Sequence, residues 1–175
     1  LQTEENCTKV FRLANIFSSG SDEVSKEARA SFTGLLKKLA SSGGSRSFRP
    51  SFFLVDQSGG NRTFLRFLES LGHDSDEHSL IAQRNMLSIL QRLLPYSGDE
   101  NLTVNQLELA REMGSREKIT QLLAWANNNP EEEVAARYGL ARVLLSITQG
   151  STSSIDVLEN RGLLNQVLEL ACSFG

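Results

Sequence analysis

The sequence KEARASFTGLLKKL at residues 26–39 recurs in altered form along the chain, as IAQRNMLSILQRLL at residues 81–94 and as VAARYGLARVLLSI at residues 134–147. Apolar side chains in each copy follow intervals of three, four and seven residues, which is the pattern of a helix that buries one face. A repeat of roughly 20 to 50 residues is typical of stacked helical units. The three copies therefore predict a repeating helical architecture.

The three copies share one arginine position and three apolar columns. Arg29, Arg84 and Arg137 occupy the same position when the copies are aligned. Because apolar side chains at such intervals share one face of a helix, we expect the three columns to be buried. The columns are Phe32, Leu87 and Leu140; Leu35, Leu90 and Val143; and Leu39, Leu94 and Ile147.

Further helices surround these copies. An acidic cluster precedes each copy, at residues 21–23, 75–77 and 130–133, and acidic side chains stabilise the start of a helix. A second apolar segment recurs between the copies, and a shorter segment that ends near a glycine precedes it. The apolar segments occupy residues 10–17, 64–71, 119–126 and 164–171, and the shorter ones lie near residues 52–57, 104–113 and 155–160. The only prolines lie where the helical patterns stop, so we expect an all-α fold.

A short helix, a glycine-containing turn, a middle helix and a longer third helix form a unit that resembles the armadillo repeat. Residues 133–140 and 162–168 carry the resemblance best. The resemblance implies a right-handed superhelical stack over the whole chain. Its parts would be a partial repeat at residues 1–20 and units at about 21–72, 73–129 and 130–175. These units exceed the roughly 40 to 47 residues usual for the class, so a HEAT-like stack is an open alternative.

Composition excludes several classes of function. A net charge of −3 argues against non-specific binding of nucleic acid. The sequence also contains no apolar run long enough to span a membrane. Cys7 and Cys172 lie at opposite ends of the chain, which favours two unpaired thiols in a reducing compartment. We therefore expect a cytoplasmic protein, or a nuclear one, without a cofactor. The polar start of the sequence leads us to expect a part of a longer protein.

The two histidines offer the best candidate for chemistry. His73 and His78 lie near Asp74 and Asp76, and such a set can bind a metal or transfer protons. A polar helix start explains the same residues, and no nucleophile motif completes a catalytic site, so we do not expect an enzyme. We expect Trp125 to be buried rather than to hold a ligand.

The polar side of the third helices is the candidate binding surface, because the resemblance places these helices along the inner face of the stack. Steps of four residues from each arginine give a stripe that is mostly basic in the first two units, which suits an acidic or phosphorylated protein segment. The alternative is that the arginines pair with the acidic start of their own helix, for example Arg84 with Asp76 or Glu77. The predicted partner-binding residues are Arg29, Lys37, Arg84, Ser88, Arg92, Arg137 and Tyr138.

The sequence thus favours a protein-interaction scaffold, with two alternatives. A helical stack can also clasp a folded protein, as a chaperone-associated or nucleotide-exchange module would. A homo-oligomer is the other alternative, because both ends of a repeat stack expose faces suited to a neighbour. The residues expected at those ends are Val10, Phe11 and Phe17, and Leu163, Val167 and Leu170.

Overall fold

The computed structural model describes residues 4–42, 60–93, 113, 115–128, 165 and 172. Within these residues the secondary structure is helical and contains no strand, which confirms the all-α class for this part of the chain. None of the helices described there combines the length and the apolar character needed to span a membrane.

The predicted middle and third helices are present wherever the structure describes the chain. The helices are α1 (Glu4–Phe17), α2 (Glu23–Ser42), α4 (Gly60–Ser70), α5 (Glu77–Leu93) and α7 (Arg116–Asn127). Each overlaps its predicted range, although α2 begins three residues earlier than the copy at residues 26–39 and ends three residues later, at Ser42. The helices expected at residues 52–57, 134–147, 155–160 and most of 104–113 and 164–171 lie outside the described residues.

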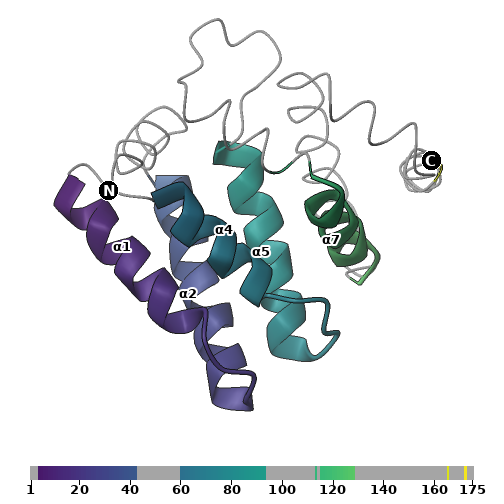
Figure 1. Ribbon diagram of the computed structural model, residues 1–175, viewed down its shortest axis with the longest axis horizontal. Helices are drawn as coiled ribbons and strands as arrows, with labels where there is room; N and C mark the ends of the chain where they lie inside the picture. Colours follow the sequence, from purple (N-terminus) through teal and green to yellow (C-terminus); the bar gives the residue numbers. More distant parts are fainter. Residues whose placement is uncertain are drawn as a thin grey trace, which may run out of the picture. The chain divides into compact units, whose positions relative to one another are not determined.

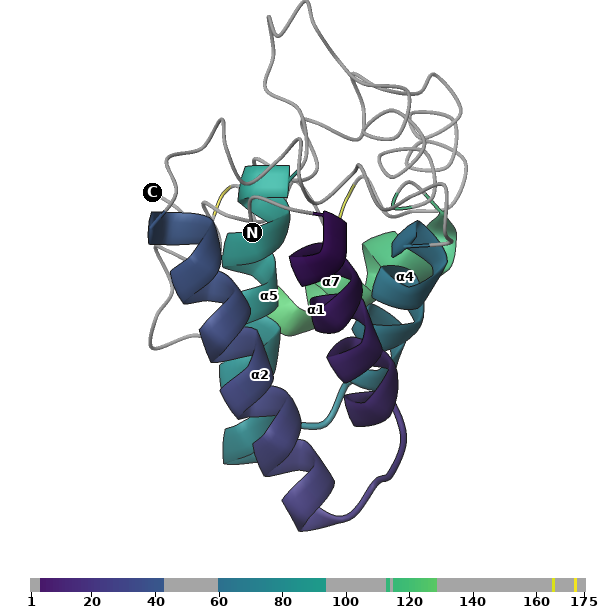
Figure 2. The ribbon, with the colours of Figure 1, turned by 90° about the vertical axis from the view of Figure 1, so that its left-hand side faces the viewer.

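The chain divides into two compact units, Leu1–Arg92 and Leu93–Gly175. The first unit contains two helical pairs, α1 with α2 and α4 with α5. In each pair a short turn reverses the chain, so the two helices run antiparallel (Figure 1). The views in Figures 1 and 2 place α1 and α4 in one layer and α2 and α5 in the other. Within this arrangement, α1 packs against both α4 and α2.

The core of the first unit is centred on Phe32 of α2. The ring of Phe32 lies 5.2 Å from that of Phe17 on α1, at an interplanar angle of 50°. It also lies 5.2 Å from the ring of Phe67 on α4, in an edge-to-face arrangement at 88°. Aromatic rings prefer such tilted contacts because the positive ring edge meets the negative face. Phe32 therefore joins the two layers and also joins the first helical pair to the second.

Two expectations about apolar residues are wrong. Leu35 was placed in a buried column, but it is 47% exposed, whereas its neighbour Leu36 is 2% exposed and belongs to the core. Val10 was expected at an open end of the stack, but it is buried because the inner face of α1 carries it. Among the apolar residues of α1 whose side chains the structure describes, Leu13 and Ile16 are exposed.

In the second unit, the structure describes α7 and the residues around it. Ser115 caps the start of α7, where its hydroxyl accepts a hydrogen bond of 3.4 Å from the backbone nitrogen of Lys118. An extended residue with a hydroxyl side chain is a favoured cap because it satisfies a free amide of the first turn. Trp125 near the end of α7 is fully buried, as predicted.

Candidate partner-binding surface

The same capping motif begins α2 and α5. The Asp22 carboxylate accepts hydrogen bonds from the backbone nitrogen of Ser25 at 3.0 Å and from its hydroxyl at 2.6 Å. Asp76 accepts the equivalent bonds from Ser79, at 3.0 and 2.8 Å. The hydrogen bond from the Ser25 hydroxyl is the main reason why the pKa of Asp22 is lowered. Both aspartates thus fulfil the helix-start role that the acidic clusters predicted.

One buried polar side chain from each of these helices donates a hydrogen bond to the backbone of the preceding turn. Arg29 Nη1 donates a hydrogen bond to the carbonyl of Gly20 at 2.7 Å and a longer one to that of Phe17 at 3.4 Å. Gln83 Nε2 donates to the carbonyl of Asp74 at 2.8 Å. Burial of a polar side chain without a hydrogen-bond partner is costly, so these bonds offset the burial of Arg29 and Gln83 and stabilise the two turns. The prediction that Arg29 binds a partner is wrong, because its side chain is buried within its own helical pair.

These contacts fix the alignment of the two helical pairs. When Asp22 is aligned with Asp76, Ser25 falls on Ser79 and Arg29 falls on Gln83. We call this the Asp22–Asp76 alignment. The sequence alignment, which paired Arg29 with Arg84, is displaced from it by one position. In the Asp22–Asp76 alignment Leu36 is the counterpart of Leu90, and both residues are buried.

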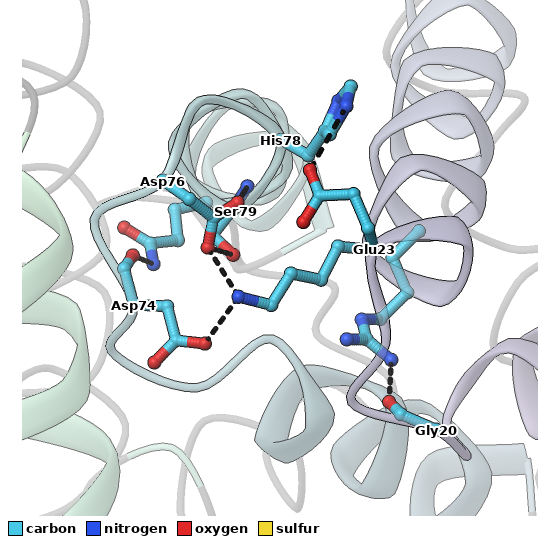
Figure 3. Close-up of polar contacts among 9 residues, drawn as sticks. Gly20, Glu23, Asp74, Asp76, His78 and Ser79 are labelled. Atoms are coloured by element: carbon cyan, nitrogen blue, oxygen red, sulfur yellow. Dashed lines mark hydrogen bonds and ion pairs between the residues drawn. The ribbon is translucent and has the colours of Figure 1, made fainter.

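Lys26 joins the two helical pairs through an ion pair (Figure 3). Its ammonium nitrogen on α2 lies 2.7 Å from Asp76 Oδ2 and 3.0 Å from Asp74 Oδ2, both in the turn between α4 and α5. One alternative expected from the sequence was that Asp76 pairs with Arg84 of its own helix. Instead, Asp76 binds a lysine that lies 50 residues earlier in the chain.

The ion pair shifts the pKa of both partners. Partial burial opposes ionisation of Asp76, but hydrogen bonds from Lys26 and Ser79 outweigh that effect and lower the pKa of Asp76 well below its ordinary value. Hydrogen bonds to Asp76 and then to Asp74 raise the pKa of Lys26 above its ordinary value. Opposite charges in contact favour the ionised form of each partner.

The lowered pKa of Asp76 predicts how stability depends on pH. The carboxylate stabilises the fold above its unfolded pKa of about 3.9, and this contribution is lost as the pH falls below that value toward the folded pKa. We expect Asp76→Asn, which can still cap α5, to melt at a lower temperature at pH 7 and to lose less stability between pH 7 and pH 2 than the wild type.

Thermal melts of both proteins over that pH range, at low and at high salt, measure this effect. Asp74→Asn is the control, since Asp74 is 64% exposed and the salt bridge that it makes is screened by solvent. If Asp76→Asn and the wild type lose the same stability in acid, Asp76 does not carry the contribution assigned to it.

The histidine segment has a structural explanation. Its acidic members, Asp74 and Asp76, face the ammonium group of Lys26. His78 Nε2 lies 3.6 Å from Glu23 Oε1 at the start of α2, and His73 is exposed. Among the residues that the structure describes, no group of three or more histidine, cysteine, aspartate or glutamate side chains could hold a metal ion. The carboxylates proposed as metal ligands thus bind a cation that the protein itself provides.

The α2 and α5 helices meet at a buried polar contact. Asn85 Nδ2 donates a hydrogen bond of 3.4 Å to the Thr33 hydroxyl, which donates in turn to the carbonyl of Ala30 at 2.8 Å. Lys37 lies one turn beyond Thr33 on α2, and Ser88 lies about one turn beyond Asn85 on α5. The two predicted site residues therefore lie at a similar level on neighbouring helices.

The predicted partner-binding residues fall into four groups. Arg29 is buried, as described above, whereas Lys37, Arg84 and Ser88 lie half-buried on α2 and α5. The backbone of Arg92 belongs to α5, but the structure does not describe its side chain. The remaining two predicted residues, Arg137 and Tyr138, lie outside the described residues. We call Lys37, Arg84 and Ser88 the α2–α5 surface.

Three structurally important residues were missed in the sequence analysis: Lys26, Gln83 and Asn85. A signal for one of them was present, because the motif Ser-Asp-Glu-x-Ser occurs at residues 21–25 and again at residues 75–79. Aligning the two motifs reproduces the Asp22–Asp76 alignment and places Gln83 opposite Arg29. The partners of Lys26 and Asn85 lie more than one helix away, and no local motif marks them.

Comparisons with known proteins add no assignment to this geometry. A scan against protein-family models, a search of curated proteins and a search of solved structures each returned no match.

Proposed function

We propose that this chain is a protein-interaction module built from stacked, armadillo-like helical units. The partner is an acidic or phosphorylated segment of another protein, which lies along the α2–α5 surface. The observation that carries this proposal is the side-by-side arrangement of α2 and α5 (Figure 2), which their Asn85–Thr33 contact holds together.

The composition of the α2–α5 surface favours an anionic partner. Lys37 on α2 and Arg84 on α5 each carry one positive charge. Ser88, one turn beyond Arg84 on α5, adds a hydroxyl that can form a hydrogen bond. Guanidinium and ammonium groups bind carboxylates and phosphates through charge-assisted hydrogen bonds. Half-burial restricts both side chains, so less rotamer entropy is lost when a partner binds.

Repetition of the helical pair supports an extended partner rather than a small molecule. The caps and turn contacts of the two pairs repeat in one alignment, so corresponding positions of α2 and α5 recur along the layer. A layer of corresponding helices presents an elongated surface, which suits a segment of protein chain.

Reversal of both positive charges tests the proposal. We expect Lys37→Glu combined with Arg84→Glu to weaken binding of acidic and phosphorylated peptides at least tenfold, because each reversal replaces attraction by repulsion. Fluorescence anisotropy against a panel of such peptides measures the affinity. Binding by the wild type should weaken between about 50 and 200 mM salt as charges are screened.

The matched control reverses two other positive charges, Lys38→Glu with Arg66→Glu. Both side chains are exposed, and the change in net charge is the same, but neither belongs to the α2–α5 surface. Melting temperatures of both double mutants separate loss of binding from loss of folding. Equal affinity of the two double mutants for the peptides would exclude this surface as the binding site.

A further inference from the structure

The second helical pair shows which of its positions contact the first pair. Phe67 packs against Phe32, and Asn85 donates a hydrogen bond to Thr33. At the start of α5, Asp76 binds Lys26, and His78 lies 3.6 Å from Glu23 (Figure 3). Ile89, further along α5, is fully buried. Phe67, Asp76, His78 and Asn85 thus lie against the first pair. Ile89 is one turn beyond Asn85 and therefore lies on the same side of α5.

The Asp22–Asp76 alignment identifies the counterparts of these five positions in the first pair. The counterpart of Phe67 is Leu13, that of Ile89 is Leu35, and that of His78 is Val24; these three are 39%, 47% and 75% exposed. The counterparts of Asp76 and Asn85 are Asp22 and Ser31, and both are exposed. We name this set the leading face: Leu13, Asp22, Val24, Ser31 and Leu35.

The contrast between the two pairs is largest at the leading face. At several other counterpart positions both members are buried, as Ala14 and Leu68 are on α1 and α4, and Leu36 and Leu90 on α2 and α5. Exposed apolar side chains that cluster on one face mark an interaction surface. Here the second pair also shows what covers such a face, since α1 and α2 contact its counterparts.

We propose that the leading face is a docking surface for another helical pair that binds as the first pair binds the second. This surface is separate from the α2–α5 surface. The partner is defined by what α2 presents to α4 and α5: an aromatic ring over Leu13, a hydroxyl side chain opposite Ser31, and a lysine that reaches the Asp22 carboxylate. The Asp22 carboxylate is the counterpart of the Asp76 carboxylate, which binds Lys26.

The chain's own first helical pair serves as the probe, because it carries this complementary set as Phe32, Thr33 and Lys26. We extend the chain by placing a second copy of residues 1–54 ahead of Leu1. The added pair then precedes α1 and α2 by the same interval at which α1 and α2 precede α4 and α5. Cys7 in both copies and the exposed free thiol Cys172 are replaced by serine. A single cysteine introduced at Leu13 of the original copy reports coverage of the leading face.

We expect the Leu13→Cys thiol to react with a maleimide roughly tenfold more slowly in the extended chain than in the unextended one, because covered sites react only when the contact opens. Leu35→Cys provides a second probe whose counterpart, Ile89, is fully buried. Arg12→Cys is the matched control. Its counterpart, Arg66, stays exposed beside the first pair, so its labelling rate should not change.

The charge of Asp22 is tested in the same extended chain. Asp22→Asn in the original copy can still cap α2 but no longer attracts a lysine, so the protection of Leu13→Cys should decrease. Circular dichroism shows whether the added residues form helices. Labelling of Leu13→Cys and Leu35→Cys at unchanged rates overturns the proposal, and so does an extended chain that gains no helix.

Discussion

Replacement of Phe32 by alanine is expected to destabilise the first unit by about 3 to 5 kcal/mol, the range for large aromatic residues in a core. The ring of Phe32 contacts Phe17 and Phe67 at 5.2 Å each, so its removal leaves a cavity between the layers. A folded domain is stable by only about 5 to 15 kcal/mol, and this loss is a large part of that total.

Chemical denaturation of the whole chain, followed by circular dichroism, measures the loss. Phe32→Leu is the conservative variant, and it should recover part of the stability because it refills some of the cavity. Val24→Ala is the control on the same helix, since Val24 is 75% exposed and should cost less than roughly 0.5 kcal/mol. A cost of less than about 1 kcal/mol for Phe32→Ala would contradict its central place in the core.

Leu90→Ala is expected to cost about 2 to 5 kcal/mol, because Leu90 is fully buried on α5. Its counterpart in the first pair depends on the alignment. The Asp22–Asp76 alignment makes Leu36 the equivalent core residue, whereas pairing Arg29 with Arg84 makes it Leu35. The two neighbouring leucines therefore test which of them belongs to the core.

We expect Leu36→Ala to cost about as much as Leu90→Ala, and Leu35→Ala to cost less than about 1 kcal/mol. The three variants remove the same side-chain atoms, so differences among them report burial. Urea midpoints measured under one condition rank the three. If Leu35→Ala proves more damaging than Leu36→Ala, the placement of Leu36 in the core and of Leu35 at the surface is wrong.

The helices of the first unit could be predicted from the sequence because burial of one helical face leaves a periodic pattern. The alignment of the copies was less certain, since adjacent apolar residues such as Leu35 and Leu36 fit the same stripe with either residue facing inward. The polar contacts resolve the choice, because Arg29 and Gln83 bond carbonyls of corresponding turns, and both caps repeat in the same alignment.

The candidate surface stays a prediction. Lys37, Arg84 and Ser88 lie half-buried on α2 and α5, where a stripe was expected. Arg29 was misjudged because a charged residue on an amphipathic helix is usually exposed, and its burial depends on a carbonyl that the turn at Gly20 directs toward it. The partner of Lys26 was beyond prediction, because residues far apart in sequence meet only after two helical pairs have packed.

The turn contacts also bear on how the first unit assembles. Arg29 and Gln83 each bond a carbonyl nine residues away, so each helical pair closes through contacts that are local in sequence. The contacts between the pairs, from Lys26 to Asp76 and from Asn85 to Thr33, span 50 and 52 residues. Local contacts close with a smaller loss of chain entropy and therefore form sooner. Each helical hairpin can thus fold as its chain segment leaves the ribosome. The second hairpin then packs against the first, which has already folded.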